Sequence, residues 1–170
     1  MNKRIAHNLI WIPISLIGIL TASLGAVWCI NEKPWLLDKS PNEALLQTSF
    51  DILFSEKINS GLSSYLRVMY RFLGLYMLTI GALIMGYVYV TRLGTKIARN
   101  YIFVIIFIML LGTYFLLFNY LPSSPFFSVL YFFTFCLFLS VFFFKIPSRL
   151  VLFFNISFVC KTNYSLNLKG

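Results

Sequence analysis

The sequence has very little charge for its length. Only 11% of its 170 residues are Asp, Glu, Lys or Arg, whereas a soluble domain carries roughly 25%. Hydrophobic residues make up 59% of the chain, so it cannot cover a globule with polar surface. This composition excludes an ordinary soluble domain, and the length allows a single domain.

Side chains that usually carry chemistry are also scarce. His7 is the only histidine, which excludes a His-based metal centre or catalytic triad. Cys29, Cys136 and Cys160 have no CxxC spacing and predict neither a disulfide nor a metal site. No carboxylate falls inside the long apolar runs, which excludes intramembrane aspartyl chemistry and the usual proton or sodium relay. We therefore expect no enzyme, no cofactor and no metal.

Long apolar runs are what the sequence does contain. A bilayer crossing takes about 20 apolar residues. Four runs free of Asp, Glu, Lys, Arg and His meet or approach this length, at 9–30, 72–91, 102–118 and 126–144. They predict an all-α fold, a polytopic membrane four-helix bundle over residues 1–146.

Both ends of the chain leave an alternative open. The basic start "MNKR" and the small residues "TASLGA" also suit a signal peptide, but the apolar run is longer than the usual h-region of about 7–15 residues. We expect a retained helix. The apolar run 150–160 is too short to span, so 147–170 is predicted to be a cytoplasmic or interfacial tail, with a fifth crossing as the alternative.

The distribution of charge predicts the orientation. All five acidic residues lie between Glu32 and Glu56. With both termini on one side, nine of the 14 basic residues lie on that side. Lys and Arg collect on cytoplasmic flanks. Both termini are therefore predicted to be cytoplasmic and the first loop extracytoplasmic. The basic charge suits anionic lipid, and its dispersal argues against a nucleic-acid partner.

The first loop is predicted to contain an amphipathic helix over about 41–59. Ser40 can cap it, Pro41 suits its first position, Glu43 completes a capping box and Gly61 can end it. One half of this helix would be apolar, with Leu45, Leu46, Phe50, Ile52, Leu53 and Phe54. Such helices usually lie in the membrane interface. The helix is expected to act as a lid, with a gate or partner-docking surface as the alternative.

Small residues predict which helices pack together. Close contact between helices in lipid depends on small side chains. The first helix carries Ser15, Gly18, Ala22 and Gly25 on one stripe, and the second carries Gly74 and Gly81 on one face. We expect the first two spanning helices to pack along these residues.

Two arginines stand at the start of the second apolar run. Arg67 and Arg71 share the helix face of Gly74 and Gly81, so they are expected to point toward the bundle or its outer mouth. They would either anchor at lipid headgroups, form an anion-attracting vestibule, or pair with Asp51 or Glu56 to clamp the loop helix. In the clamp, Arg71 is expected to be the more buried arginine.

Two stretches carry a resemblance to a known family. "YLRVMYRFLGLYMLTIGALIMG" and "LLGTYFLLFNYLPSSPFFSVLYFFTF" resemble the DoxX-like group of small four-helix membrane proteins. The likeness covers roughly residues 8–144: a long first loop, an Arg entering a Gly-bearing second helix, and a short Pro/Ser turn between the last two helices. It implies a four-helix bundle and no catalytic role.

Two classes of function follow. The first is a non-catalytic membrane protein that binds, assembles or regulates a membrane protein partner or a second copy of itself in the lipid bilayer. The second is a small carrier or lipid-handling protein with a cavity between its helices and Arg67 and Arg71 at the outer entrance. A cavity lined by polar residues would favour the second class, and a closed bundle packed with Phe the first. The list of expected lining residues is Tyr70, Arg71, Tyr76, Thr79, Thr113 and Tyr114.

Overall fold

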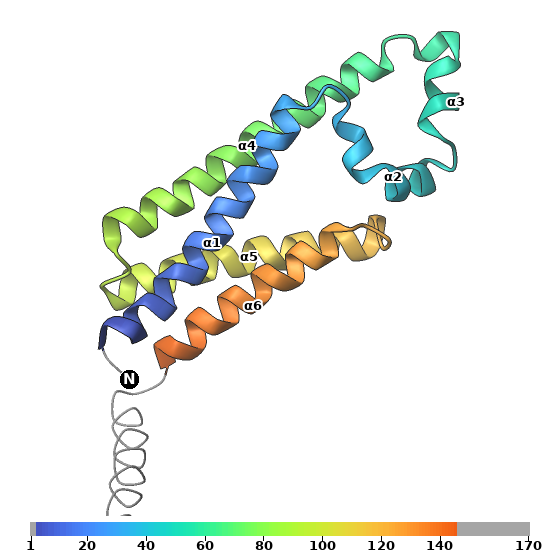
Figure 1. The fold of residues 1–170 in the computed structure, drawn as a ribbon. Coiled ribbons are helices and arrows are strands. Elements are labelled where there is room, and N and C mark those ends of the chain that lie inside the picture. The colour runs from blue at the N-terminus through green and yellow to red at the C-terminus, as the bar shows by residue number, and fades with distance from the viewer. Residues whose placement is uncertain (1–2, 146–170) are drawn as a thin grey trace, which may run out of the picture.

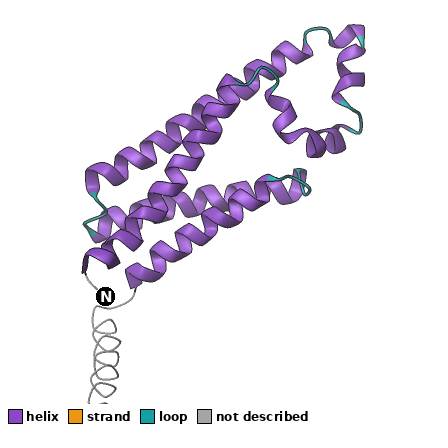
Figure 2. Ribbon diagram, viewed as in Figure 1, coloured by secondary structure: helices purple, strands orange, loops and turns teal. Residues whose placement is uncertain are grey.

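The computed structural model describes the backbone of residues 3–145, which is helical apart from short connections (Figure 2). Within these described residues, four helices are long and apolar enough to cross a membrane. They are α1 (Lys3–Ile30), α4 (Leu62–Thr91), α5 (Lys96–Tyr120) and α6 (Phe126–Lys145). The all-α class and the four candidate spans are therefore confirmed, while the predicted tail at 147–170 lies outside the described residues.

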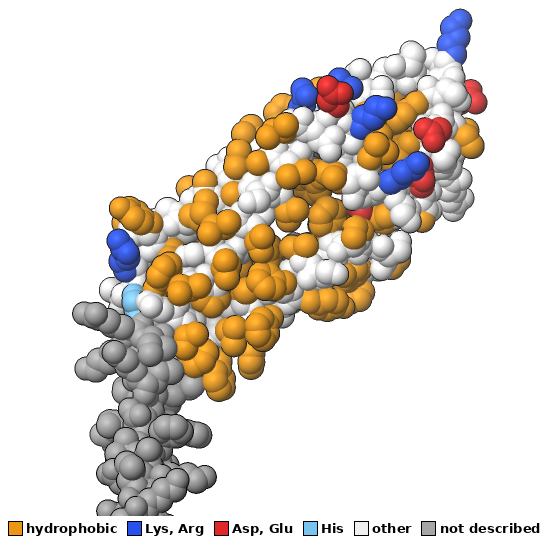
Figure 3. Space-filling view, in the orientation of Figure 1, with side chains coloured by type: hydrophobic (Ala, Val, Ile, Leu, Met, Phe, Trp, Pro, Cys, Tyr) orange, Lys and Arg blue, Asp and Glu red, His pale blue; other side chains and the backbone are white. Residues whose placement is uncertain are grey.

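Helix α1 occupies the centre of the arrangement. It packs against both α4 and α6, and α5 packs against α6. The beginning of α1, the α4–α5 turn and the end of α6 lie at one end of the molecule, and the first loop lies at the other (Figure 1). Charged side chains gather mainly at the loop end of the visible face, and hydrophobic ones cover its middle (Figure 3). This distribution suits a bundle whose middle faces lipid.

The glycines predicted to lie between the first two spanning helices do lie there. A β-carbon placed on Gly25 would lie 2.5 Å from the carbonyl oxygen of Gly74, and one on Gly81 would lie 2.5 Å from the carbonyl oxygen of Gly18. Ala22 is buried at the same interface, and its backbone is among the nearest atoms to Gly81. The α1 and α4 backbones therefore touch directly, which only residues without a side chain permit at Gly25 and Gly81.

The tightly packed core lies toward the end that holds the α4–α5 turn. Ile14, Ile17, Leu93 and Ile106 have 0% exposed surface. The buried hydroxyl of Ser140 donates to the carbonyl oxygen of Ile10 at 3.0 Å and joins α6 to α1. The helices are thus held together most closely in this half of the bundle.

The first loop does not form the single helix predicted over 41–59. It contains a 3₁₀ helix, η1 (Pro34–Asp38), then α2 (Lys39–Leu46), α3 (Phe50–Ser55) and a second 3₁₀ turn, η2 (Lys57–Asn59). Gln47 is left-handed at φ 55°, which ends α2, and the Ser49 hydroxyl caps α3 by accepting from the Ile52 N–H at 3.3 Å. The continuous apolar face is therefore absent from this loop.

The predicted helix boundaries in the loop are also wrong. Helix α2 begins at Lys39, so Pro41 is not its first residue and Ser40 is not its cap. The Glu43 carboxylate accepts from the backbone N–H of Phe50 at 2.8 Å, which takes it away from a capping box. Gly61 ends no helix and directly precedes α4. The cause is tertiary: Phe50 and Phe54 turn inward onto buried Trp35, with ring centroids 6.4 and 5.4 Å from it.

Candidate functional site

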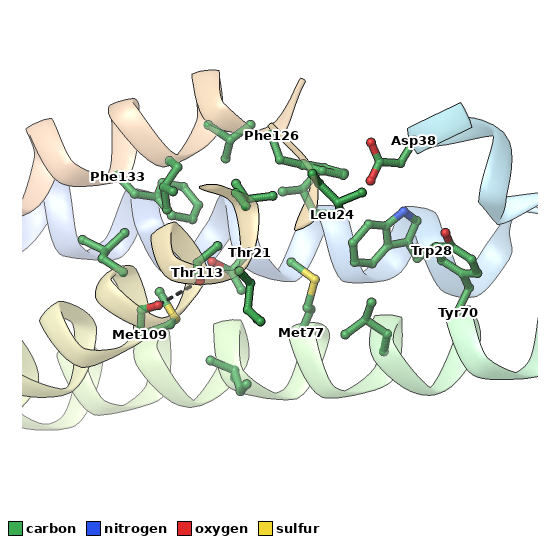
Figure 4. Close-up of a pocket in the computed structure, with 18 of the residues that line it drawn as sticks. Thr21, Leu24, Trp28, Asp38, Tyr70, Met77, Met109, Thr113, Phe126 and Phe133 are labelled. Atoms are coloured by element: carbon green, nitrogen blue, oxygen red, sulfur yellow. Dashed lines mark hydrogen bonds between the residues drawn. The ribbon is translucent and has the colours of Figure 1, made fainter. Parts of the chain in front are cut away.

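A cavity of about 540 Å³ lies between the four long helices, in the half of the bundle nearest the first loop (Figure 4). Its wall is mostly apolar, from residues such as Leu24, Met77, Leu110 and Phe133. The polar or hydrogen-bonding side chains that line it are Thr21, Trp28, Asp38, Asn42, Tyr70 and Thr113. Its size falls within the range of about 300–1,000 Å³ that is usual for small-molecule sites.

The polar groups are divided between the middle and one end of the cavity. In the middle, the Thr21 hydroxyl donates to the Ile17 carbonyl and the Thr113 hydroxyl to the Met109 carbonyl, each at 2.8 Å. Both hydroxyl protons are therefore used within their own helices. At the loop end, Asp38, Asn42 and Tyr70 lie together beside Trp28. The cavity is thus amphipathic, with an apolar body and one polar end.

Hydrogen bonds between the loop and the helices hold this polar end. The Ser124 hydroxyl, in the α5–α6 turn, donates to an Asp38 carboxylate oxygen at 3.3 Å. The Asn42 amide donates to the Tyr70 hydroxyl of α4 at 2.9 Å. Nearby, Arg67 Nε donates to the Glu32 carbonyl at 2.9 Å. The loop therefore closes the end of the bundle, and its residues Asp38 and Asn42 form part of the cavity wall there.

Asp38 has an unusual environment for a carboxylate. Its side chain lies against apolar surface and the residue is 7% exposed. Burial raises the pKa of Asp38 above its ordinary value of 3.8, and the hydrogen bond from Ser124 opposes that rise. The polar end of the cavity thus contains an acid that is partly deprived of water.

The two arginines do not line the cavity or form the predicted clamp. Arg67 is partly buried and Arg71 is exposed, so the expectation that Arg71 is the more buried one is wrong. In residues 3–145 neither arginine forms an ion pair; Asp51 approaches Lys39 at 3.9 Å instead, and Glu56 is exposed. The Arg67 side chain donates instead to the carbonyl oxygen of Glu32, just after α1. Asp51 and Glu56 lie further along the loop, in α3 and just after it.

Only part of the polar lining was expected from the sequence. Tyr70 and Thr113 line the cavity as expected for the lipid-handling class, whereas Arg71, Tyr76, Thr79 and Tyr114 do not. Asp38, Asn42, Trp28 and Thr21 were missed. One signal was present for Asp38, since it lies between the apolar run "PWLL" and a helix start, a position where an acid can be drawn against the bundle.

Metal binding finds no support in the described part of the chain, where no three His, Cys, Asp or Glu side chains come close enough to share an ion. No protein-family model, curated protein or solved structure matches this chain, so its resemblance to the DoxX-like group stays a prediction.

Proposed function

We propose that this chain is a non-catalytic, multi-pass membrane protein that holds an amphipathic lipid between its helices. The observation that carries the proposal is the cavity of about 540 Å³ with an apolar body and a polar end at Asp38, Asn42 and Tyr70. An acyl or prenyl chain suits the apolar body, and a headgroup suits the polar end. The site offers one carboxylate and threonine hydroxyls that are already bonded, which favours binding over covalent chemistry.

Residues at the edge of the cavity support access from the side. Met69, Leu73 and Ile80 of α4 line the cavity and are also more than a third exposed, as is Leu116 of α5. Helices α4 and α5 make no extensive contact with each other between their shared turn and the loop end. In a bilayer this opening faces acyl chains, so a lipid can enter without crossing water.

A second candidate function is binding of a membrane protein partner or a second copy of the chain. Exposed apolar side chains on the first loop favour it, because the broken loop helix turns Leu45, Leu46 and Ile52 outward and leaves Ile58 91% exposed. Large exposed apolar groups outside the spanning helices are typical of interaction surfaces or of contact with the membrane interface. Co-purification in mild detergent, with identification of both protein and lipid, distinguishes the two functions.

The lipid-binding proposal is tested by filling the cavity. Thr113→Trp places a large ring in the middle of the cavity, and Leu111→Trp places the same ring on the exposed side of α5. Lipid retained after purification is counted by native mass spectrometry. We expect the Thr113→Trp variant to lose bound lipid and the Leu111→Trp variant to keep it. Equal lipid content in both, with both folded, contradicts the proposal; Met77→Trp serves as a second cavity-filling variant from α4.

A further inference from the structure

We propose that the polar end of the cavity selects a lipid whose headgroup carries a cationic amine. This inference rests on the proposed lipid-binding function and names the class of lipid. Its elements are one buried carboxylate, a group of aromatic rings beside it, and a lining without positive charge.

The carboxylate is the first element. One oxygen of Asp38 accepts from Ser124 at 3.3 Å, and within residues 3–145 the second oxygen has no hydrogen-bond donor or cation assigned to it. Figure 4 shows the carboxylate directed toward the cavity, near Leu24 and Trp28. Because a buried carboxylate is unfavourable without a compensating charge or donor, an ammonium group in the cavity would complete this site.

Aromatic rings are the second element. Trp28 contacts Tyr70 and Phe126 edge to face, with ring centroids 6.1 and 5.5 Å apart. All three rings line the cavity at the end that holds Asp38. An ammonium group beside Asp38 would lie near these rings, and aromatic rings attract cations at short range. The rings therefore reinforce the selection made by the carboxylate.

Charge and hydrogen-bonding capacity form the third element. Among the residues that the structure describes, no Lys, Arg or His lines the cavity. Lys39, the residue after Asp38, instead approaches Glu43 at 3.7 Å and Asp51 at 3.9 Å. The Asn42 amide nitrogen donates to Tyr70, which leaves the Asn42 carbonyl oxygen as an acceptor. An end of the cavity that is rich in acceptors and negative charge suits an ammonium group and repels a headgroup that carries negative charge alone.

Four amphiphiles with the same fourteen-carbon chain test the inference: the primary amine, the trimethylammonium, the alcohol and the carboxylate. Each is added to the purified protein in maltoside micelles at neutral pH, and affinity is measured by thermal shift and native mass spectrometry. We expect both cationic amphiphiles to bind at least about tenfold more tightly than the alcohol, because only they place a positive charge beside Asp38. The carboxylate is expected to bind least, because its charge repels that of Asp38.

Two variants assign the preference to the cavity. Asp38→Asn keeps the size of the side chain and is expected to remove the preference for amines while alcohol binding remains. Asp51→Asn removes an exposed carboxylate of the same loop and is expected to change nothing. Amine preference that survives Asp38→Asn, or equal binding of the carboxylate and the amine, overturns the inference alone. Failure of all four amphiphiles to bind overturns the proposed function as well.

Discussion

Arg67 and Arg71 both lie near the start of α4, but their side chains have different surroundings. They lie one helical turn apart, yet within the described part of the chain only the Arg67 side chain has a hydrogen-bond partner, the Glu32 carbonyl at 2.9 Å. Arg71 is exposed, and its backbone carbonyl accepts a weak hydrogen bond from the Cys29 thiol at 3.6 Å. Arg67 therefore joins the start of α4 to the segment that leaves α1, whereas the Arg71 side chain is available to lipid headgroups.

Replacing each arginine by alanine is expected to affect hydrogen exchange in the first loop differently. Arg67→Ala removes the bond to Glu32, and we expect backbone hydrogen exchange in residues 31–38 to accelerate about two- to tenfold, in line with the usual strength of one hydrogen bond. Arg71→Ala is the matched control and is expected to leave that exchange unchanged. A larger effect from Arg71→Ala contradicts the assignment of the connecting role to Arg67.

Asp38 makes a second prediction, on the dependence of stability on pH. Because burial raises its pKa above 3.8, the native protein binds this proton more tightly than the unfolded chain does. The stability it contributes is present below pH 3.8 and is lost as the pH rises through the raised pKa. Asp38→Asn does not titrate, so its thermal midpoint is expected to rise relative to the unaltered protein between acid and neutral pH. A constant difference across that range contradicts the prediction.

At the scale of elements, the contact between α1 and α4 rests on backbone against backbone. Gly25 and Gly81 leave no room for a β-carbon, and Gly74 would place one 2.7 Å from the Gly25 carbonyl oxygen. Gly86 lies on the same helix with nothing within 4 Å of a β-carbon. One helix thus contains glycines with and without a packing role.

This difference gives a direct test of the helix contact. Gly81→Leu is expected to force α1 and α4 apart and to reduce stability by about 1–3 kcal/mol or more, as overpacking does. Gly86→Leu adds the same side chain toward lipid and is expected to change little. Gly18→Leu is expected to fall between them, because the nearest atom to a β-carbon there is Met85 Cγ at 3.0 Å, on a flexible side chain. Thermal unfolding in detergent measures all three, and equal midpoints for Gly81→Leu and Gly86→Leu contradict the contact.

The elements also show where sequence reasoning succeeds and fails. The α1–α4 contact was predictable because helical periodicity alone places Gly18 and Gly25 on one face. The break at Gln47 was not, because it follows from inward packing of Phe50 and from a side-chain bond between Glu43 and the Phe50 backbone. Asp38 was missed for a similar reason, since its hydrogen-bond donor Ser124 lies 86 residues away in the sequence. Local periodicity is enough to predict the helices, whereas the cavity depends on contacts between residues that are far apart in the sequence.

At the scale of the whole molecule, the orientation in the membrane remains a prediction. We expect the first loop outside and the α4–α5 turn inside, from the nine basic residues on the predicted cytoplasmic side. Ile58 in the first loop and Lys96 at the start of α5 are exposed, so each suits cysteine labelling. In a background without other cysteines, an impermeant maleimide should label the Ile58→Cys variant on intact cells and the Lys96→Cys variant only after permeabilisation. The opposite pattern contradicts the orientation.

The central position of α1 has a consequence for assembly during synthesis. Helix α1 is made before its partners α4 and α6, and the Ser140–Ile10 hydrogen bond joins residues 130 positions apart. Contacts so distant in sequence form late, because the intervening chain must be made and inserted first. We expect α1 and α4 to associate as an early hairpin. The side of α1 that packs against α6 would then face lipid until α6 is inserted.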